Sequence, residues 1–289
     1  MFQEDGMQPM HTMVTNDTTR VLSRRNCARP AWIGNYRVLG VLGEGGQGRV
    51  YLGMSKSMGN VAIKVPHAWE AMDAPEQHRF LREANLVRKL APFCTATLLE
   101  AGLIRDCPYI VSEYIAGPSL RDLVRRDGPR SGSGLHRLAV ATLSALMAIH
   151  RAGVIHRDIK PANVIMSSEG PVVIDFGIAQ LLDHVNTRSR NAGTPSYMAP
   201  EQLTERPLSP ATDLFAWAAT MVFAATGRPA FPGRTLPAVM HSIMTGEPDL
   251  TCVPEPLRLL ALACLAKDPQ SRPCAAQLLS WLTANPDSR

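Results

Sequence analysis

The sequence predicts an α+β chain with two lobes. One is a small lobe built on a five-stranded antiparallel sheet with one main helix, and the other is larger and mainly helical. Short β-branched and apolar runs separated by glycines fill residues 36–115, whereas long apolar helical patterns follow residue 119. Gly117-Pro118 breaks the pattern between them. We therefore expect a flexible lead-in at 1–34, lobes at 35–115 and 116–283, and a tail at 284–289.

The strands and helices of the two lobes are predicted in the following order. Glycine turns divide residues 36–43, 48–53 and 60–65 into a three-stranded meander, and residues 97–104 and 108–115 add two strands. Between them, Phe80, Leu81, Ala84 and Val87 recur at helical spacing, so residues 74–90 form a helix that packs on the sheet. Further helices are predicted at 135–153, 210–227 and 255–266, strands near 164–174, and a loop at 127–134.

Composition excludes several function classes. The 289 residues carry 30 basic and 25 acidic side chains, and no basic run exceeds two residues, which argues against a nucleic-acid partner. The longest uncharged apolar stretch, 214–227, has 14 residues, fewer than the roughly 18 that a membrane span needs. Without an apolar signal region at the N-terminus, we expect a cytoplasmic protein. Its six cysteines form no C-x-x-C pair, so we expect reduced thiols rather than a zinc or redox site.

A glycine-rich segment, GEGGQGRVYLG at residues 43–53, joins two predicted strands. Such a loop is neither a dinucleotide-binding turn nor a Walker loop, because no helix follows it. Gly43, Gly45 and Gly48 lack Cβ atoms, so their backbone N–H groups can approach phosphate oxygens closely. A purely structural hairpin is the alternative. The candidate phosphate-covering residues are Leu42, Gly43, Glu44, Gly45, Gly46, Gln47, Gly48 and Val50.

Two charged residues accompany this loop. Lys64 ends the apolar strand VAIK, where its ammonium can reach the same phosphates. Glu83 interrupts the inward face of the helix at 74–90, and a carboxylate facing an apolar sheet needs a cation partner. Lys64 is the nearest candidate by topology. An exposed strand-end lysine and a solvated helix glutamate are the alternatives.

Two further motifs indicate a family. HRDIKPAN occupies residues 156–163, and IDFG follows at 174–177. With the glycine loop, VAIK and the Ala-Pro-Glu of residues 199–201 in order, the sequence resembles protein kinases over about residues 36–283. Within that family it is most similar to eukaryotic-like bacterial serine/threonine kinases of actinobacterial type. The resemblance implies the two-lobed kinase fold, a cleft between the lobes that binds ATP, and transfer of the γ-phosphoryl group to a hydroxyl.

The resemblance also implies catalytic roles. Asp158 orients the acceptor hydroxyl and takes its proton, while Asn163 and Asp175 hold Mg²⁺, with Mn²⁺ as an alternative. Lys64 and Glu83 belong to the catalytic set. Lys160 neutralises the γ-phosphate, and together with Thr194 it favours serine and threonine acceptors. These residue types suit phosphoryl transfer, which depends on in-line positioning and charge neutralisation.

By the same resemblance, the residues at 113–115 form the linker whose backbone binds adenine, chiefly Glu113 and Ile115. The adenine ring lies between Val50, Ala62 and Ile165, which can equally be plain core residues. Ser112 precedes the linker as a small residue that opens space behind adenine. Glu201 and Arg272 match a structural ion pair of the family, and Asp213, in the helix DLFAWA, matches a structural anchor. We expect these residues to support the fold rather than to take part in catalysis.

Residues 178–193 form a polar segment with hydroxyls at Thr187 and Ser189. The resemblance identifies it as an activation loop whose phosphate pairs with Arg157, which implies autophosphorylation at Thr187 or Ser189. A merely solvated loop is the alternative.

The expected partners are protein substrates with Ser or Thr acceptors and a second copy of the chain for phosphorylation in trans. The end of the sequence at Arg289 suggests a stand-alone soluble domain. Two other functions stay open: a nucleotide-binding pseudokinase scaffold, and a small-molecule phosphotransferase.

Overall fold

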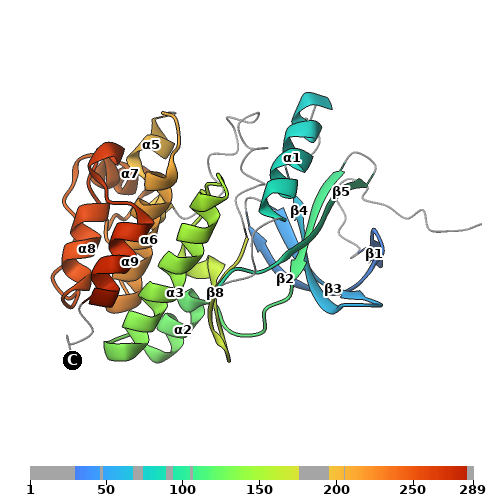
Figure 1. Cartoon of the computed structure of the whole chain (residues 1–289), viewed down its shortest axis with the longest axis horizontal. Helices are drawn as coiled ribbons and strands as arrows, with labels where there is room; N and C mark the ends of the chain where they lie inside the picture. Colours follow the sequence, from blue (N-terminus) through green and yellow to red (C-terminus); the bar gives the residue numbers. More distant parts are fainter. Residues whose placement is uncertain are drawn as a thin grey trace, which may run out of the picture.

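The computed structural model describes residues 30–45, 48–67, 74–88, 94–104, 107–175, 195–204 and 206–284. The chain forms a sheet lobe and a helical lobe that lie side by side, with α1 over the sheet (Figure 1). This is the two-lobed α+β architecture that the sequence predicts. The division falls after the last strand of the main sheet, near Gly117, where the sequence pattern changes.

The sheet has six antiparallel strands in the order β1-β2-β3-β4-β6-β5. They are β1 Trp32–Ile33, β2 Tyr36–Gly45, β3 Gly48–Ser55, β4 Gly59–Pro66, β5 Leu98–Ile104 and β6 Cys107–Glu113. The predicted count of five was one short, because β1 lies in the segment interpreted as a lead-in. Its two residues pair with β2 across a two-residue Gly34-Asn35 turn, and Gly-Asn between two strand residues is itself a hairpin signal.

Two apolar clusters flank this sheet. One consists of strand residues such as Tyr36, Val61, Ile63 and Val111. On the other side, α1 Ala74–Val87 buries Phe80, which is fully buried, and joins the large core of the helical lobe. The 3.6-residue spacing of the sequence therefore predicted which face of this helix packs inward.

The helical lobe is built around α6, whose residues Leu214 to Ala224 are all buried. Trp217 donates its indole N–H to Thr142 Oγ1 on α3, at 2.9 Å, which satisfies the polar atom of a fully buried side chain. The elements of this lobe are α2 Leu120–Asp127, α3 Gly132–Arg151, η2 Pro161–Asn163, β7 Val164–Ser167, β8 Gly170–Val173, η5 Pro195–Tyr197, α5 Pro200–Leu203, α6 Pro210–Thr226, α7 Leu236–Thr245, α8 Leu257–Cys264, η6 Pro269–Ser271 and α9 Ala275–Ala284.

The helix α3 is long and apolar enough to cross a membrane by length and composition, and within the described part of the chain it is the one helix of that kind. It packs against α6, α9 and β8 (Figure 1). Eight of its residues are buried there, which is the behaviour of a core helix.

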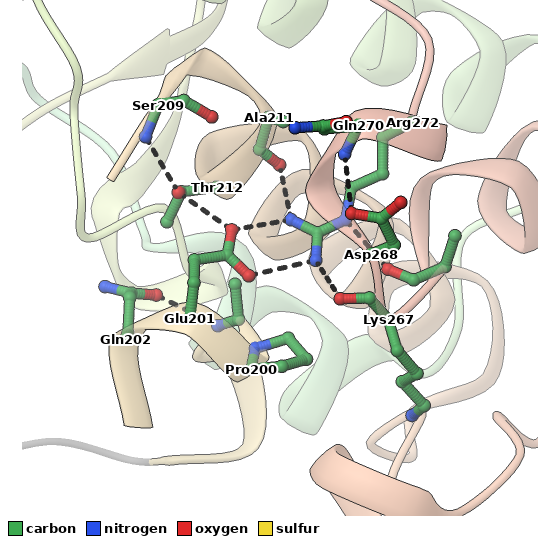
Figure 2. A network of polar contacts seen from close by, with 12 residues as sticks. Pro200, Glu201, Gln202, Ser209, Ala211, Thr212, Lys267, Asp268, Gln270 and Arg272 are labelled. Carbon is green, nitrogen blue, oxygen red and sulfur yellow. Dashed lines mark hydrogen bonds and ion pairs between the residues drawn. The ribbon is translucent and has the colours of Figure 1, made fainter. Parts of the chain in front are cut away.

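A buried arginine ties the end of the helical lobe to its middle (Figure 2). Arg272 donates from Nη1 to Glu201 Oε1 at 2.7 Å and from Nη2 to Glu201 Oε2 at 3.0 Å. Its remaining donors reach the carbonyl oxygens of Ala266, Ala211 and Lys267 at 2.8, 3.0 and 3.2 Å. Such full hydrogen bonding is what allows an ion pair with side chains 0% and 2% exposed.

We expect Arg272→Met to lower the free energy of unfolding by about 3–5 kcal/mol, because it leaves the Glu201 carboxylate buried without its cation. The control is Arg258→Met, which removes an exposed partner of Glu255 and costs less than about 1 kcal/mol. Denaturant unfolding measures both.

The pH dependence follows from the same pair. Burial raises the pKa of Glu201, but the hydrogen bonds and charge of Arg272 outweigh it, and the pKa lies below its ordinary value. The pair's contribution is thus full above that ordinary value and is lost as pH falls through the lowered pKa. Equal losses of unfolding free energy in Arg272→Met and Arg258→Met would contradict this interpretation of the Arg272–Glu201 pair.

Candidate active site

A cleft of about 390 Å³ opens between the two lobes. Strands β2, β3 and β4 contribute to its wall from the sheet lobe, and η2 and β7 contribute from the helical lobe. Most of the predicted nucleotide-binding and metal-binding residues line it: Leu42, Gly43, Val50, Ala62, Lys64, Glu113, Ile115, Asn163, Ile165 and Asp175. These residues are spread over more than 130 positions of the sequence and lie around one cavity.

Apolar side chains from both lobes line the cleft. Val50 on β3 and Ala62 on β4 come from the sheet lobe, and Ile165 on β7 comes from the helical lobe. The linker after β6 also lines the cleft, and its Glu113 N–H is already bonded to Thr97 O at 2.9 Å. Ile115 lies beyond the end of the strand. This arrangement suits a flat, mostly apolar ring with polar edges.

Gly117 fixes the linker onto the helical lobe. Its φ is +143°, and a Cβ at this position would stand 2.4 Å from the carbonyl oxygen of Met166 on β7. The next residue, Pro118, accepts a hydrogen bond from the Met166 N–H at 2.9 Å. Only glycine permits this close approach, so the linker and β7 are held together beside the cleft.

The loop that carries Asp158 is organised by Asp213, a fully buried carboxylate on α6. Asp213 accepts from the backbone N–H of His156 at 2.8 Å and of Arg157 at 2.7 Å, and its Oδ2 lies 2.8 Å from His150 Nε2. Arg157 has a φ of +68°. These bonds hold the loop in a backbone conformation that non-glycine residues rarely adopt.

His156 supports the loop from inside. Burial lowers its pKa, with the charges of Asp213, Asp158 and Asp175 acting in the opposite direction. Its Nε2 lies 3.2 Å from Ile174 O, and its Nδ1 accepts from the Asp158 N–H at 3.3 Å. A neutral ring protonated at Nε2 satisfies both contacts.

The Asp158 carboxylate lies within a set of polar donors. Lys160 Nζ is 2.9 and 2.7 Å from its two oxygens, and Asn163 Nδ2 donates to Oδ2 at 3.0 Å and to the Asp158 carbonyl at 2.9 Å. Its side chain is 13% exposed. A carboxylate held in this way can accept a proton from a hydroxyl placed against it, and the adjacent ammonium can neutralise an anionic group.

The ion pairs that Lys64 and Glu83 form differ from the predicted pairing. Lys64 Nζ lies 2.6 and 2.8 Å from the Asp175 oxygens. Glu83, the expected partner of Lys64, instead has Arg157 Nη2 3.9 Å away. Burial raises the pKa of Glu83, and the charges of Arg157 and then Arg79 oppose that rise. Each carboxylate still has a cation, but the partners are exchanged, because Asp175 lies against the end of β4 and supplies both of its oxygens to Lys64.

Asn163 and Asp175 form a small oxygen donor set in the cleft. Because Asn163 donates Nδ2 to Asp158, its amide oxygen remains as an acceptor. The described residues contain no group of three or more His, Cys, Asp or Glu that could hold a metal. A metal here would therefore take further oxygens from phosphates and water, as Mg²⁺ commonly does, so the residues fit such an ion.

Three predicted loop residues do not line the cleft in the described structure. Glu44 pairs with Arg49 at 2.7 Å, and Gly45 pairs with Gly48 at the end of the β2–β3 hairpin. Gly48 has a structural reason to be glycine, since a Cβ there would stand 2.4 Å from Val65 O. Gly46, Gln47, Thr187, Ser189 and Thr194 lie outside the described residues.

The sequence interpretation missed part of the cleft. Ala96, Leu98 and Ile110 also line it, and Ser119, Arg121 and Asp122 line it where α2 begins. The sequence did indicate the second group, because it marks the start of a helix. Ser119 is the N-cap of α2 and accepts from the Asp122 N–H at 3.1 Å. A serine directly after a Gly-Pro break, three residues before an acid, indicates such a helix start.

Comparisons with known proteins agree with this geometry. The protein kinase domain family matches residues 36–281. The chain is 39% identical over 258 residues to the probable serine/threonine-protein kinase PkwA of Thermomonospora curvata, covering 89% of this chain and 35% of that protein. It is 38% identical over 256 residues to the serine/threonine-protein kinase AfsK of Streptomyces coelicolor, covering 88% and 32%. The chain thus spans about a third of the length of these relatives.

Solved structures share the fold. The PknI kinase domain of Mycobacterium tuberculosis, solved as a point mutant, is similar with a TM-score of 0.68 and 25% identity, covering 86% of this chain and 95% of that one. Rad53 1-466 in complex with AMP-PNP is similar with a TM-score of 0.71 and 23% identity, covering 85% and 64%.

We expect Gly117→Ala to weaken nucleotide binding at least about fivefold and to lower the free energy of unfolding by about 2–3 kcal/mol, because the linker must move away from Met166. The control is Gly59→Ala, which also has a positive φ but has no heavy atom within 4 Å of the added Cβ, and costs about 1 kcal/mol. Calorimetric titration with ATP and thermal unfolding measure the two effects. Unchanged ATP affinity in Gly117→Ala would show that the linker position does not matter to the cleft.

Proposed function

We propose that this chain, which belongs to the protein kinase domain family, transfers the γ-phosphoryl group of ATP to serine and threonine hydroxyls of proteins. The observation that carries the proposal is the Asp158 carboxylate, held between Lys160 and Asn163. The family uses ATP and a divalent metal, and Mg²⁺ is the metal we propose. The printed names of the relatives support Ser and Thr as acceptors.

The residues divide the work of transfer. The Asp158 carboxylate orients the acceptor hydroxyl and accepts its proton, while the Lys160 ammonium beside it offsets charge on the transferring group. Lys64 positions the phosphates from the sheet lobe. Asn163 Oδ1 and an Asp175 carboxylate oxygen would hold Mg²⁺, which when bound neutralises charge on the phosphate oxygens. Because little covalent chemistry falls to the protein, this positioning is the main source of rate.

The exchanged ion pairs support a proposal about activation. Lys64 is paired with Asp175, and Glu83 with Arg157, so the arrangement differs from the Lys64–Glu83 pair of the working site. Arg157 Nε and Nη1 are buried and have no hydrogen-bond partner among the described residues. We propose that they take a phosphate on Thr187 or Ser189, added in trans by a second copy of the chain.

The five cysteines in the described part of the chain are free thiols. This supports our proposal of a cytoplasmic setting, because disulfides are rare in reducing compartments.

We expect the wild-type chain with ATP and Mg²⁺ to gain phosphate, and Asp158→Asn to lose at least about a hundredfold in rate while binding ATP within about twofold of wild type, because only the proton acceptor is removed. Intact mass measures incorporation, and peptide mapping then locates it at Thr187 or Ser189. The control is Asp127→Asn, an exposed aspartate on α2.

The possible outcomes separate the alternatives. Nucleotide binding without transfer to any acceptor would favour a pseudokinase scaffold. Transfer only to small hydroxylated compounds would favour a small-molecule phosphotransferase. Active enzyme with both Thr187 and Ser189 unmodified would contradict the activation proposal alone.

A further inference from the structure

The helix α2 places basic side chains next to the region where an acceptor must bind. Its first turn borders the cleft through Ser119, Arg121 and Asp122. It packs on η2 Pro161–Asn163, the turn that follows Asp158 and Lys160, and lies beside β7. A residue that points outward from this helix therefore lies close to the path of any chain whose hydroxyl reaches Asp158.

Arg121 and Arg125 share one exposed side of this helix. They are four residues apart, so their side chains are neighbours on the helix surface. Both are exposed. Arg121 Nε lies 3.4 Å from Asp122 Oδ1, whereas Arg125 has no ion pair within the described ranges. The helix α2 contains three arginines and two aspartates, so it carries a net positive charge.

Tyr197, at the end of η5 Pro195–Tyr197, packs against α6, a helix that α2 also contacts. Its ring packs edge-on against Phe223 of α6, with centroids 6.4 Å apart. Burial raises the pKa of the Tyr197 hydroxyl to about 12, and the charges of Arg125 and then Arg121 oppose that rise. Tyr197 and the α2 arginines thus belong to elements that both contact α6.

The two aspartates of α2, Asp122 and Asp127, already have hydrogen-bond and ion-pair partners within the chain. Asp122 accepts from Ser119 Oγ at 2.6 Å and pairs with Arg121. The Ser119 hydroxyl, then Arg121 and Arg125, lower its pKa against the opposing effect of burial. Asp127 is paired with Arg126 at 2.7 Å. This leaves Arg125 as the guanidinium most free to bind an acid from outside the chain.

We propose that Arg121 and Arg125 select substrates with acidic side chains within a few residues of the phosphorylated Ser or Thr. This inference rests on the proposed function and names its substrate class. An extended peptide advances about 3.3 Å per residue, so positions a few residues from the acceptor can reach a helix that packs on the catalytic turn. Carboxylates match the planar donor groups of arginine.

The test uses four peptides that share one central Thr in a neutral background. One is neutral, one carries two Glu on the N-terminal side of the Thr, one carries two Glu on the C-terminal side, and one carries two Lys on each side. We expect one or both Glu peptides to show kcat/KM at least about fivefold above the neutral peptide, chiefly through KM, and the Lys peptide to fall below it. The preference weakens as salt rises from 50 to about 500 mM.

The matched variants are Arg125→Glu and Arg126→Glu, which change the charge by the same amount on adjacent residues of one helix. Arg125→Glu removes the preference for Glu and raises the rate with the Lys peptide. Arg126→Glu keeps the wild-type order, because Arg126 is already paired with Asp127. Thermal unfolding shows that both variants are folded.

The outcomes distinguish this proposal from the proposed function. Equal kcat/KM for all four peptides, or a Glu preference that Arg125→Glu leaves intact, would overturn the acidic selectivity while leaving the kinase activity established. No phosphate transfer to any peptide and none to the chain itself would overturn both.

Discussion

The catalytic loop depends on one buried charge. Asp213 is inaccessible to solvent, comes from the most deeply buried helix of the large lobe, and accepts the backbone N–H groups of His156 and Arg157. Those two bonds compensate for the unfavourable φ of Arg157 and so fix the direction in which the next residue, Asp158, projects. Hydrogen bonds to a buried carboxylate are stronger than neutral ones. The position of the Asp158 carboxylate is thus set by the core of the helical lobe.

The remaining parts of the site come from separate elements that meet at the cleft. The sheet lobe supplies Lys64, and β7 and η2 supply Ile165 and Asn163. Asp158 has its polar partners, Lys160 and Asn163, in place. Lys64 is paired with Asp175 rather than with Glu83, the partner expected from the sequence. Glu83 comes from α1 and Arg157 from the loop before Asp158, so their pairing depends on how these two elements pack.

Most of the site could be predicted from sequence because it is encoded in short motifs with fixed spacing. Asp158, Lys160 and Asn163 lie on one turn, so their proximity follows from local geometry alone. The pairing of Glu83 with Arg157, instead of with Lys64, could not be predicted. It depends on the distance between α1 and the loop that contains Arg157, and local sequence patterns do not determine that distance.

The fold shows the same division between local and tertiary information. Periodicity identified the strands and helices, but β1 was missed because two residues give too little pattern, although the Gly34-Asn35 turn marked it. Gly48 was interpreted as a phosphate contact, and the structure adds a second requirement for glycine there, the close carbonyl of Val65 on the neighbouring strand. The packing of α2 on η2 could not be read from sequence either, because the two elements are about 40 residues apart.

The most direct test of this account is the turnover of Asp213→Asn, measured together with its affinity for ATP. An asparagine keeps the shape but replaces one accepting oxygen with a donor that faces the loop N–H groups. The account predicts that kcat falls at least about tenfold while ATP affinity stays within about twofold and the variant unfolds cooperatively. Wild-type kcat in a folded Asp213→Asn chain would contradict the claim that the buried carboxylate positions Asp158.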